Sequence, residues 1–254
     1  MSSSVIELSE VNAEVLREVA LPVWNDTTEK VAIIVPYRGR MKHLFNFLIR
    51  MLPFLSKQRK QPVIILTEQE GDGAFNRAKL FNAAIKEIRE SVPGDLLHGI
   101  DCFILHDVDK VPTSPSILYE CGQNVRQLVT VCRSKAHKGR LYEAFLGGVT
   151  AFSWEHVKTI NGASNLFTGW GGEDDELLVR LKLNNITVDR VKGGEGVFDE
   201  FDANHAREKN SARYELIAEE NVTARWKEDG LNQTRYELLS RIDYDLFVWL
   251  LVSI

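Results

Sequence analysis

The chain has 254 residues, of which 44% are hydrophobic and 26% are charged, so it can bury the core of one sizeable α/β domain. Its net charge of −5 and its pI near 5.8 argue against nucleic acid as the main partner. No run approaches the roughly 18 apolar residues of a membrane span, and the N-terminal residues lack the basic region and apolar core of a signal peptide.

The first half of the chain predicts alternating strands and helices. Residues 31–37 (VAIIVPY) and 62–68 (PVIILTE) are apolar, β-branched runs typical of strands buried on both faces, and residues 101–109 (DCFILHDVD) predict a third strand that ends in acids. Residues 39–55 and 74–90 carry apolar side chains at helical spacing. This order of elements predicts a parallel sheet with both faces covered.

The second half predicts further strands at 127–132 (QLVTVC), 146–154 (LGGVTAFSW) and 185–191 (NITVDRV), and the apolar tail 246–254 fits a last strand. No repeat, low-complexity segment or linker divides the chain. We therefore expect one α/β domain over residues 31–254, with a Rossmann-like N-terminal half and a mixed central sheet flanked by helices. Residues 1–30 are expected to form an N-terminal extension that is partly disordered.

Charged residues gather at the predicted carboxyl ends of the strands, where such sheets bind their ligands. Arg38 and Arg40 follow the first strand, Arg77 and Lys79 open the second helix, and Asp107 and Asp109 end the third strand. Each feature alone is common. Together they provide the cations and the carboxylate pair that hold a diphosphate bridged by a divalent metal ion.

The stretch FTGWGGEDDELLVRL (167–181) places four consecutive carboxylates, Glu173 to Glu176, shortly after Trp170. One interpretation is structural: three leucines form one face of a short helix ending near Asn185, and acids suit its positive N-terminal end. The other is functional, because a tryptophan between glycines beside acids suits a sugar with a flat apolar face. The stretch alone leaves both open.

Seven segments of the chain carry a family resemblance: VAIIVPYRGR, FNRAKLFNAA, FILHDVD, FLGGVTAFS, INGASNLFTGWGGEDDE, HAREKN and DGLN. In this order they resemble the catalytic domain of the animal β-1,4-galactosyltransferases, from about Val31 to the C-terminus. The resemblance implies one nucleotide-sugar transferase domain, with residues 31–109 as the donor-nucleotide half and residues 110–254 as the acceptor half with mobile loops. It implies inverting transfer of galactose from UDP-galactose to a terminal sugar hydroxyl of a glycan or glycoconjugate, forming a β-1,4 linkage.

The resemblance also implies a donor site. The corresponding residues are Pro36, Tyr37, Arg38, Arg40, Phe75, Arg77, Asp107, Val108, Phe145, Gly148 and Trp170. Phe145 replaces a tyrosine that determines, in the family, whether galactose or N-acetylgalactosamine is used as the donor sugar. Because its ring keeps the bulk, galactose is favoured, and β-1,4 transfer of N-acetylgalactosamine from UDP-N-acetylgalactosamine is the alternative.

Asp174 corresponds to the catalytic base. The implied acceptor contacts are Trp170, Glu173, Asp174, Asp175, Arg213, Tyr214 and Ile217. A base must reach the acceptor hydroxyl while its neighbours fix the acceptor ring, and an acid cluster at a helix start provides both. The last three residues match an N-acetyl pocket for N-acetylglucosamine, whereas LHDVD and SNLFTGWG are also similar to the xylose-directed branch, so the acceptor stays open.

Asp109 and His205 correspond to metal ligands of the family. A Mn²⁺-like ion would stabilise the negative charge that develops on the diphosphate leaving group. Three residues before His205 many relatives have a methionine, whereas this chain has Asp202. Asp202 either ligates the metal, which would make the site more tolerant of Mg²⁺, or is a bystander.

Three cysteines and four N-glycosylation sequons leave the cellular compartment open on composition alone. Cys102 and Cys121 correspond to a disulfide of the family, which leaves Cys132 unpaired and favours an oxidising lumen. Family members are usually anchored in the Golgi by an N-terminal span, so the resemblance implies the Golgi lumen. Membrane association would come only through a segment absent from this chain.

A function of another class also fits part of the pattern. A relative that binds nucleotide sugars or glycans without catalysis would share the fold but would be expected to have lost part of its catalytic set. Asp109, Asp174 and His205 are all present. Their presence favours an enzyme.

Overall fold

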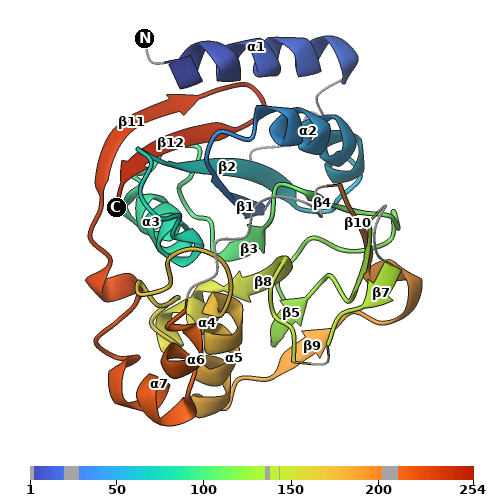
Figure 1. Cartoon of the computed structure of the whole chain (residues 1–254). Coiled ribbons are helices and arrows are strands. Elements are labelled where there is room, and N and C mark those ends of the chain that lie inside the picture. Colours follow the sequence, from blue (N-terminus) through green and yellow to red (C-terminus); the bar gives the residue numbers. More distant parts are fainter. Residues whose placement is uncertain (1–2, 20–28, 135–137, 143, 202–210) are drawn as a thin grey trace.

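The computed structural model describes residues 3–19, 29–134, 138–142, 144–201 and 211–254 (Figure 1). The strands of the main sheet are β1 Lys30–Tyr37, β2 Gln61–Gln69, β3 Cys102–His106, β5 Val125–Gln127, β8 Val149–Ser153, β9 Val188–Arg190, β11 Glu237–Asp243 and β12 Val248–Ser253. Within the described residues they form one sheet in the order β11-β12-β2-β1-β3-β8-β5-β9. β12, β2, β1 and β3 are parallel neighbours. β11 pairs antiparallel with β12, and β8 pairs antiparallel with β3, so the sheet is mixed as predicted.

Helices cover both faces of the sheet. α1 Ser3–Glu18 and α2 Met41–Leu55 pack on the face that receives the odd-numbered side chains of β1, from Val31 to Val35. α3 Arg77–Glu90, α4 Trp154–Thr159 and α5 Glu173–Leu183 pack on the other face, against Ala32 and Ile34. β1 is thus buried on both sides, which explains its unbroken apolar sequence. The predicted α/β class is confirmed.

A smaller sheet lies beside the main one. It contains β4 Lys110–Pro112, β10 Val197–Glu200, β6 Val131–Arg133 and β7 Lys138–Arg140, in that order. The C-terminal half also contains α6 Arg213–Leu216, α7 Glu219–Arg225 and two 3₁₀ turns, η1 Gly193–Gly196 and η2 Leu231–Gln233. Figure 1 shows β4, β7 and β10 together at one side of the main sheet. β4 directly follows the acids after β3, so this sheet borders the predicted ligand edge.

Two local predictions need correction, and one helix was not predicted. The third strand ends at His106 rather than at residue 109, because the amide of Lys110 donates to the carbonyl of Asp107 and closes a turn. The run 127–132 is not one strand, since it leaves the main sheet after Gln127 and enters the small sheet at Val131. The N-terminal extension contains the helix α1, which packs against α2 in Figure 1.

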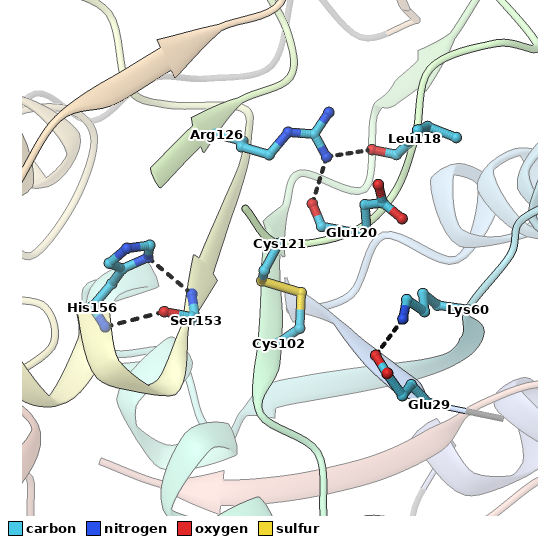
Figure 2. Close-up of a disulfide and its surroundings, with 9 residues drawn as sticks. All are labelled: Glu29, Lys60, Cys102, Leu118, Glu120, Cys121, Arg126, Ser153 and His156. Carbon is cyan, nitrogen blue, oxygen red and sulfur yellow. Dashed lines mark hydrogen bonds and ion pairs between the residues drawn. A yellow bond between two sulfur atoms is a disulfide. The ribbon is translucent and has the colours of Figure 1, made fainter. Parts of the chain in front are cut away.

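A disulfide joins the start of β3 to the segment before β5 (Figure 2). Cys102 and Cys121 pair with their Cα atoms 5.6 Å apart, which confirms the predicted bridge, and Cys132 is buried and free. Arg126 donates to the carbonyls of Leu118 and Glu120 beside it. The bridge therefore closes the loop that contains the turn after β3. Among the described residues, no helix is both long and apolar enough to cross a membrane.

Candidate active site

The charged residues predicted at the strand ends converge in the structure. β1 and β3 are parallel neighbours, so Arg40 after β1 and Asp109 after β3 lie at the same edge of the sheet. Arg40 Nη2 lies 3.5 Å from Asp109 Oδ2. Lys79, by contrast, has no ion pair with an acid of this edge among the described contacts. The edge combines cations and acids in the way that binding a diphosphate requires.

Arg77 links the edge to the acidic helix. Its Nη2 lies 2.7 Å and its Nε 2.9 Å from Asp107 Oδ1, while Nη1 lies 3.4 Å from Glu173 Oε1. Burial disfavours the charged form of Asp107, but the cations of Arg77 and Lys110 override it and hold its pKa well below the usual range. One guanidinium thus connects the donor side with the start of α5.

The turn after β3 is fixed from inside the protein. His106 is fully buried; its Nδ1 lies 2.8 Å from the carbonyl oxygen of Asp107 and its Nε2 2.9 Å from the hydroxyl of Tyr119. Burial lowers the pKa of His106 to about 4, so the ring is neutral at pH 7. A neutral ring can donate to the carbonyl and accept from the hydroxyl. We identified neither residue from the sequence.

The predicted nucleotide contacts differ in what they expose. Arg38 donates to the carbonyls of Gly71 and Gly73, at 3.2 and 2.5 Å, and its guanidinium lies 5.3 Å from the ring centre of Phe75. The side chain of Tyr37 instead points into the core, where its hydroxyl contacts Met41. Pro36 and Val108 are also buried. The side chains of these three residues are buried. They could contact a donor nucleotide only through their backbone atoms or after a local rearrangement.

The glycine pair Gly147–Gly148 makes room for two charged side chains. A Cβ atom on Gly147 would lie 2.5 Å from Asp174 Oδ2 and 2.8 Å from the ring of Phe145. Gly148 has a φ of +76°, and a Cβ atom there would meet Val129 and the stem of Lys110 at about 3 Å. Gly148 was predicted from the sequence as a site residue and Gly147 was not, although both stand in the segment FLGGVTAFS.

The acid run divides into two functions. Glu176 is fully buried, lies 2.8 Å from Arg180 and 3.3 Å from Arg225, and holds α5 in the core. Asp174 is partly buried, faces Gly147, and has its pKa raised to about 7 by burial and by the neighbouring charges of Glu173 and Asp175. The structural interpretation of the run is therefore confirmed for Glu176, and the functional interpretation stays a prediction for Asp174. A carboxylate with a pKa near 7 is suited to accept a proton at neutral pH.

Exposed aromatic side chains surround these acids. The guanidinium of Arg213 lies 5.6 Å from the ring centre of Trp170 and 4.7 Å from that of Tyr214. The hydroxyl of Tyr142 donates to Asp175 Oδ1 over 2.7 Å, a contact that the sequence analysis missed. Ile217 caps the short helix α6 that carries Arg213 and Tyr214. Aromatic faces beside hydrogen-bonding carboxylates are suited to a sugar ring.

The predicted metal site is only partly described. Asp109 is buried, and the ammonium group of Lys110 pairs with Asp109 and also with Asp107 and Glu200. His205 and Asp202 lie outside the described residues. The described part of the chain contains no group of three or more His, Cys, Asp or Glu side chains that could hold a metal ion. Among the predicted ligands, the described residues therefore supply the carboxylate of Asp109, a ligand type that suits a hard divalent ion.

Comparisons with known proteins identify the family. Residues 6–122 match the N-terminal region of glycosyl transferase group 7, and residues 127–205 match the N-terminal domain of galactosyltransferase. The chain is 36% identical to human beta-1,4-galactosyltransferase 4 over 242 residues, which cover 92% of the chain and 67% of that protein. The chain belongs to the β-1,4-galactosyltransferase family of glycosyltransferases. The match reaches into α1 and thus begins earlier than the predicted resemblance.

Other relatives agree with this assignment. Rat beta-1,4-galactosyltransferase 4 is 37% identical over 238 residues, and the chain spans 66% of its length. The catalytic domain of Drosophila beta-1,4-galactosyltransferase 7, crystallised with xylobiose, superposes with a TM-score of 0.71 at 26% identity, covering 89% of this chain and 94% of that one. A mutant of the Drosophila enzyme was crystallised with manganese, UDP-Gal and xylobiose. The Drosophila enzyme therefore shares the fold of the described α/β domain.

Proposed function

We propose that the chain transfers galactose from UDP-galactose to a hydroxyl of a terminal sugar, of the N-acetylglucosamine or xylose type, forming a β-1,4 linkage with inversion. The observation that carries the proposal is the position of Asp174. Its carboxylate lies against Gly147, between the charged edge that suits a diphosphate and the aromatic side chains that suit a sugar. The relationship to galactosyltransferases and the UDP-Gal bound to a mutant relative support the donor.

The mechanism assigns each group to one role. Asp174 accepts the proton of the acceptor hydroxyl as that oxygen attacks the anomeric carbon, and its pKa of about 7 lets it do so at neutral pH. Glu173 and Asp175 orient the acceptor ring, with Asp175 held by Tyr142. Trp170 covers the donor sugar from the loop before α5. Since no second carboxylate acts as a nucleophile, a single displacement inverts the anomeric carbon.

The donor's diphosphate is held by Arg38, Arg40 and Arg77. Asp109 and His205 would hold Mn²⁺, and Mg²⁺ would be tolerated if Asp202 also ligates. When bound, the ion supplies positive charge that stabilises the leaving diphosphate. Asp107 contacts the donor sugar while Arg77 keeps it ionised.

The choice of galactose rests on Phe145. Its ring lies 2.8 Å from the position of a Cβ atom on Gly147 and packs edge-on against Tyr142. The ring therefore fills space beside Gly147, which disfavours the larger N-acetylated donor. We place the enzyme in the Golgi lumen, because its relatives are galactosyltransferases and its disulfide requires an oxidising compartment.

A donor and acceptor matrix tests the proposal. The purified chain is assayed with UDP-galactose and UDP-N-acetylgalactosamine, each against N-acetylglucosamine and xylose, with Mn²⁺ and with chelator. We expect metal-dependent transfer from UDP-galactose to at least one acceptor. Preference for UDP-N-acetylgalactosamine would show that the enzyme transfers N-acetylgalactosamine instead of galactose. UDP binding with no transfer to either acceptor would indicate a binding protein.

A further inference from the structure

Lys110 is a buried lysine in the centre of the acidic edge. Its side chain is 8% exposed, and its Nζ lies 3.3 Å from Asp107, 3.4 Å from Asp109 and 3.1 Å from Glu200. Two of these acids come from the turn before β4, and Glu200 ends β10, the neighbour of β4. A buried ammonium group with three carboxylate partners is a fixed part of the site.

The stem of Lys110 is confined by the backbone. A Cβ atom on Gly148 would lie 3.1 Å from both Cδ and Cε of Lys110, so the stem passes directly over that glycine. The side chain of Arg40, the other cation on Asp109, is 28% exposed, whereas that of Lys110 is 8% exposed and pairs with three carboxylates. These three contacts hold the charge of Lys110 near Asp109.

Both carboxylate oxygens of Asp109 face a cation. Oδ1 lies 3.4 Å from Lys110 and Oδ2 lies 3.5 Å from Arg40. A divalent ion that binds Asp109 must approach the charge of Lys110, and this repulsion is strong in a partly dehydrated site. A nucleoside diphosphate would bring several negative charges to the same edge and so would offset this repulsion.

We infer that Lys110 makes binding of the divalent metal conditional on the diphosphate of the nucleotide, so that the metal and UDP enter the site together. The inference rests on the proposed function, since it requires a metal-bridged diphosphate. By linkage, UDP must raise the affinity for Mn²⁺ by the same factor as Mn²⁺ raises the affinity for UDP. Without the ammonium charge, Mn²⁺ would bind Asp109 more tightly on its own.

Binding of Mn²⁺, measured by the loss of its free electron-paramagnetic-resonance signal, tests the inference without turnover. For the wild type we expect the affinity to rise by about tenfold or more when UDP is present. Lys110→Met should raise the affinity without UDP by about tenfold and reduce the effect of UDP. Lys110→Gln should act in the same direction, whereas Lys110→Arg should keep the wild-type behaviour.

Lys158→Met is the matched control, because Lys158 pairs with Glu155 on the surface of α4. It should leave both affinities unchanged, and circular dichroism establishes that each variant is folded. Equal Mn²⁺ affinity of the wild type with and without UDP would overturn the inference, and so would a folded Lys110→Met or Lys110→Gln protein with unchanged or weaker Mn²⁺ binding. Absence of UDP binding to the wild type with Mn²⁺ would instead overturn the proposed function.

Discussion

The carboxylate of Asp174 rests against the backbone of Gly147, so closely that a Cβ atom on Gly147 would lie 2.5 Å from Asp174 Oδ2. The same Cβ atom would contact the ring of Phe145 at 2.8 Å. Gly147 therefore sets the distance between the proposed base and Phe145, the residue proposed to limit the donor pocket. Its small size has a consequence for catalysis that can be measured.

Gly147→Ala should reduce kcat by about 10- to 100-fold, because a displacement of a catalytic group by about 1 Å costs up to this much. UDP affinity should change little, since the residues proposed to hold the nucleotide follow β1 and β3. Gly194→Ala is the control, because a Cβ atom on Gly194 meets no atom within 4 Å. Steady-state kinetics of the two variants decide the matter, and similar kcat values for both would contradict this role of Gly147.

The rate should depend on pH through Asp174. Its pKa is raised to about 7 by burial and by Glu173 and Asp175, so the active, ionised form is lost as the pH falls below 7. We expect kcat/KM to decline on the acid side of about pH 7. Asp175→Asn removes one of the negative charges that raise the pKa of Asp174. The decline of kcat/KM in this variant should therefore occur at lower pH. Asp189→Asn, an exposed acid on β9, should leave the decline in place.

Phe145→Leu should shift donor selectivity. The smaller side chain opens space beside Gly147, so use of UDP-N-acetylgalactosamine relative to UDP-galactose should rise by about 10-fold. Competition assays with both donors measure this ratio directly. Phe54→Leu, where the ring packs on Tyr119 away from the site, should leave the ratio unchanged. An unchanged ratio in Phe145→Leu would remove Phe145 from the donor pocket.

Loss of the disulfide should destabilise the chain. Cys102→Ser removes the closure of a loop of 19 residues, and loops of this size contribute about 3 kcal/mol in the chain-entropy account. Denaturant unfolding should show this loss, while Cys132→Ala, at a free buried thiol, should cost less. Recovery of Cys102 and Cys121 as free thiols in secreted protein would contradict both the bridge and the luminal placement.

The sequence predicted the parts of the fold that follow from periodicity. The apolar runs of β1 and β2, the helix that ends at Leu55 and the acid-led helix from Glu173 all appear close to their expected positions. Short strands were harder, because the run 127–132 has continuous β propensity yet changes sheets within six residues. Helix α1 was missed because its apolar face gains stability by packing on α2 and on the segment before β12, where the amide of Leu246 donates to Asn12.

The site was predicted as a set of charges but not as a set of contacts. Arg77, Asp107 and Glu173 were each identified, yet only the fold shows that one guanidinium joins both acids. Gly147 and Lys110 were missed because their roles depend on close approach of segments distant in sequence. The motif resemblance supplied roles for Trp170 and Asp174 that composition and periodicity left open. The assigned roles and the division at residue 109 stay predictions.

Asp174→Asn should also reveal a cost of the proposed base to stability. The folded pKa of Asp174, about 7, lies above its ordinary value, so ionisation opposes folding increasingly as the pH rises to 7 and fully above it. The variant should therefore melt about 3–6 °C higher than the wild type at pH 8, with a smaller gain at pH 5. A gain that does not depend on pH would mean that Asp174 is not the titrating group.

The most direct test of the account is the turnover of Asp174→Asn beside its affinity for UDP. Asparagine keeps the size of the side chain but cannot accept the acceptor's proton, so we predict that kcat falls by about 10²- to 10⁴-fold. Calorimetry with Mn²⁺ should show nearly normal UDP affinity, because Arg38, Arg77 and Asp109 remain. Turnover within about threefold of the wild type would contradict Asp174 as the base and make Glu173 the next candidate.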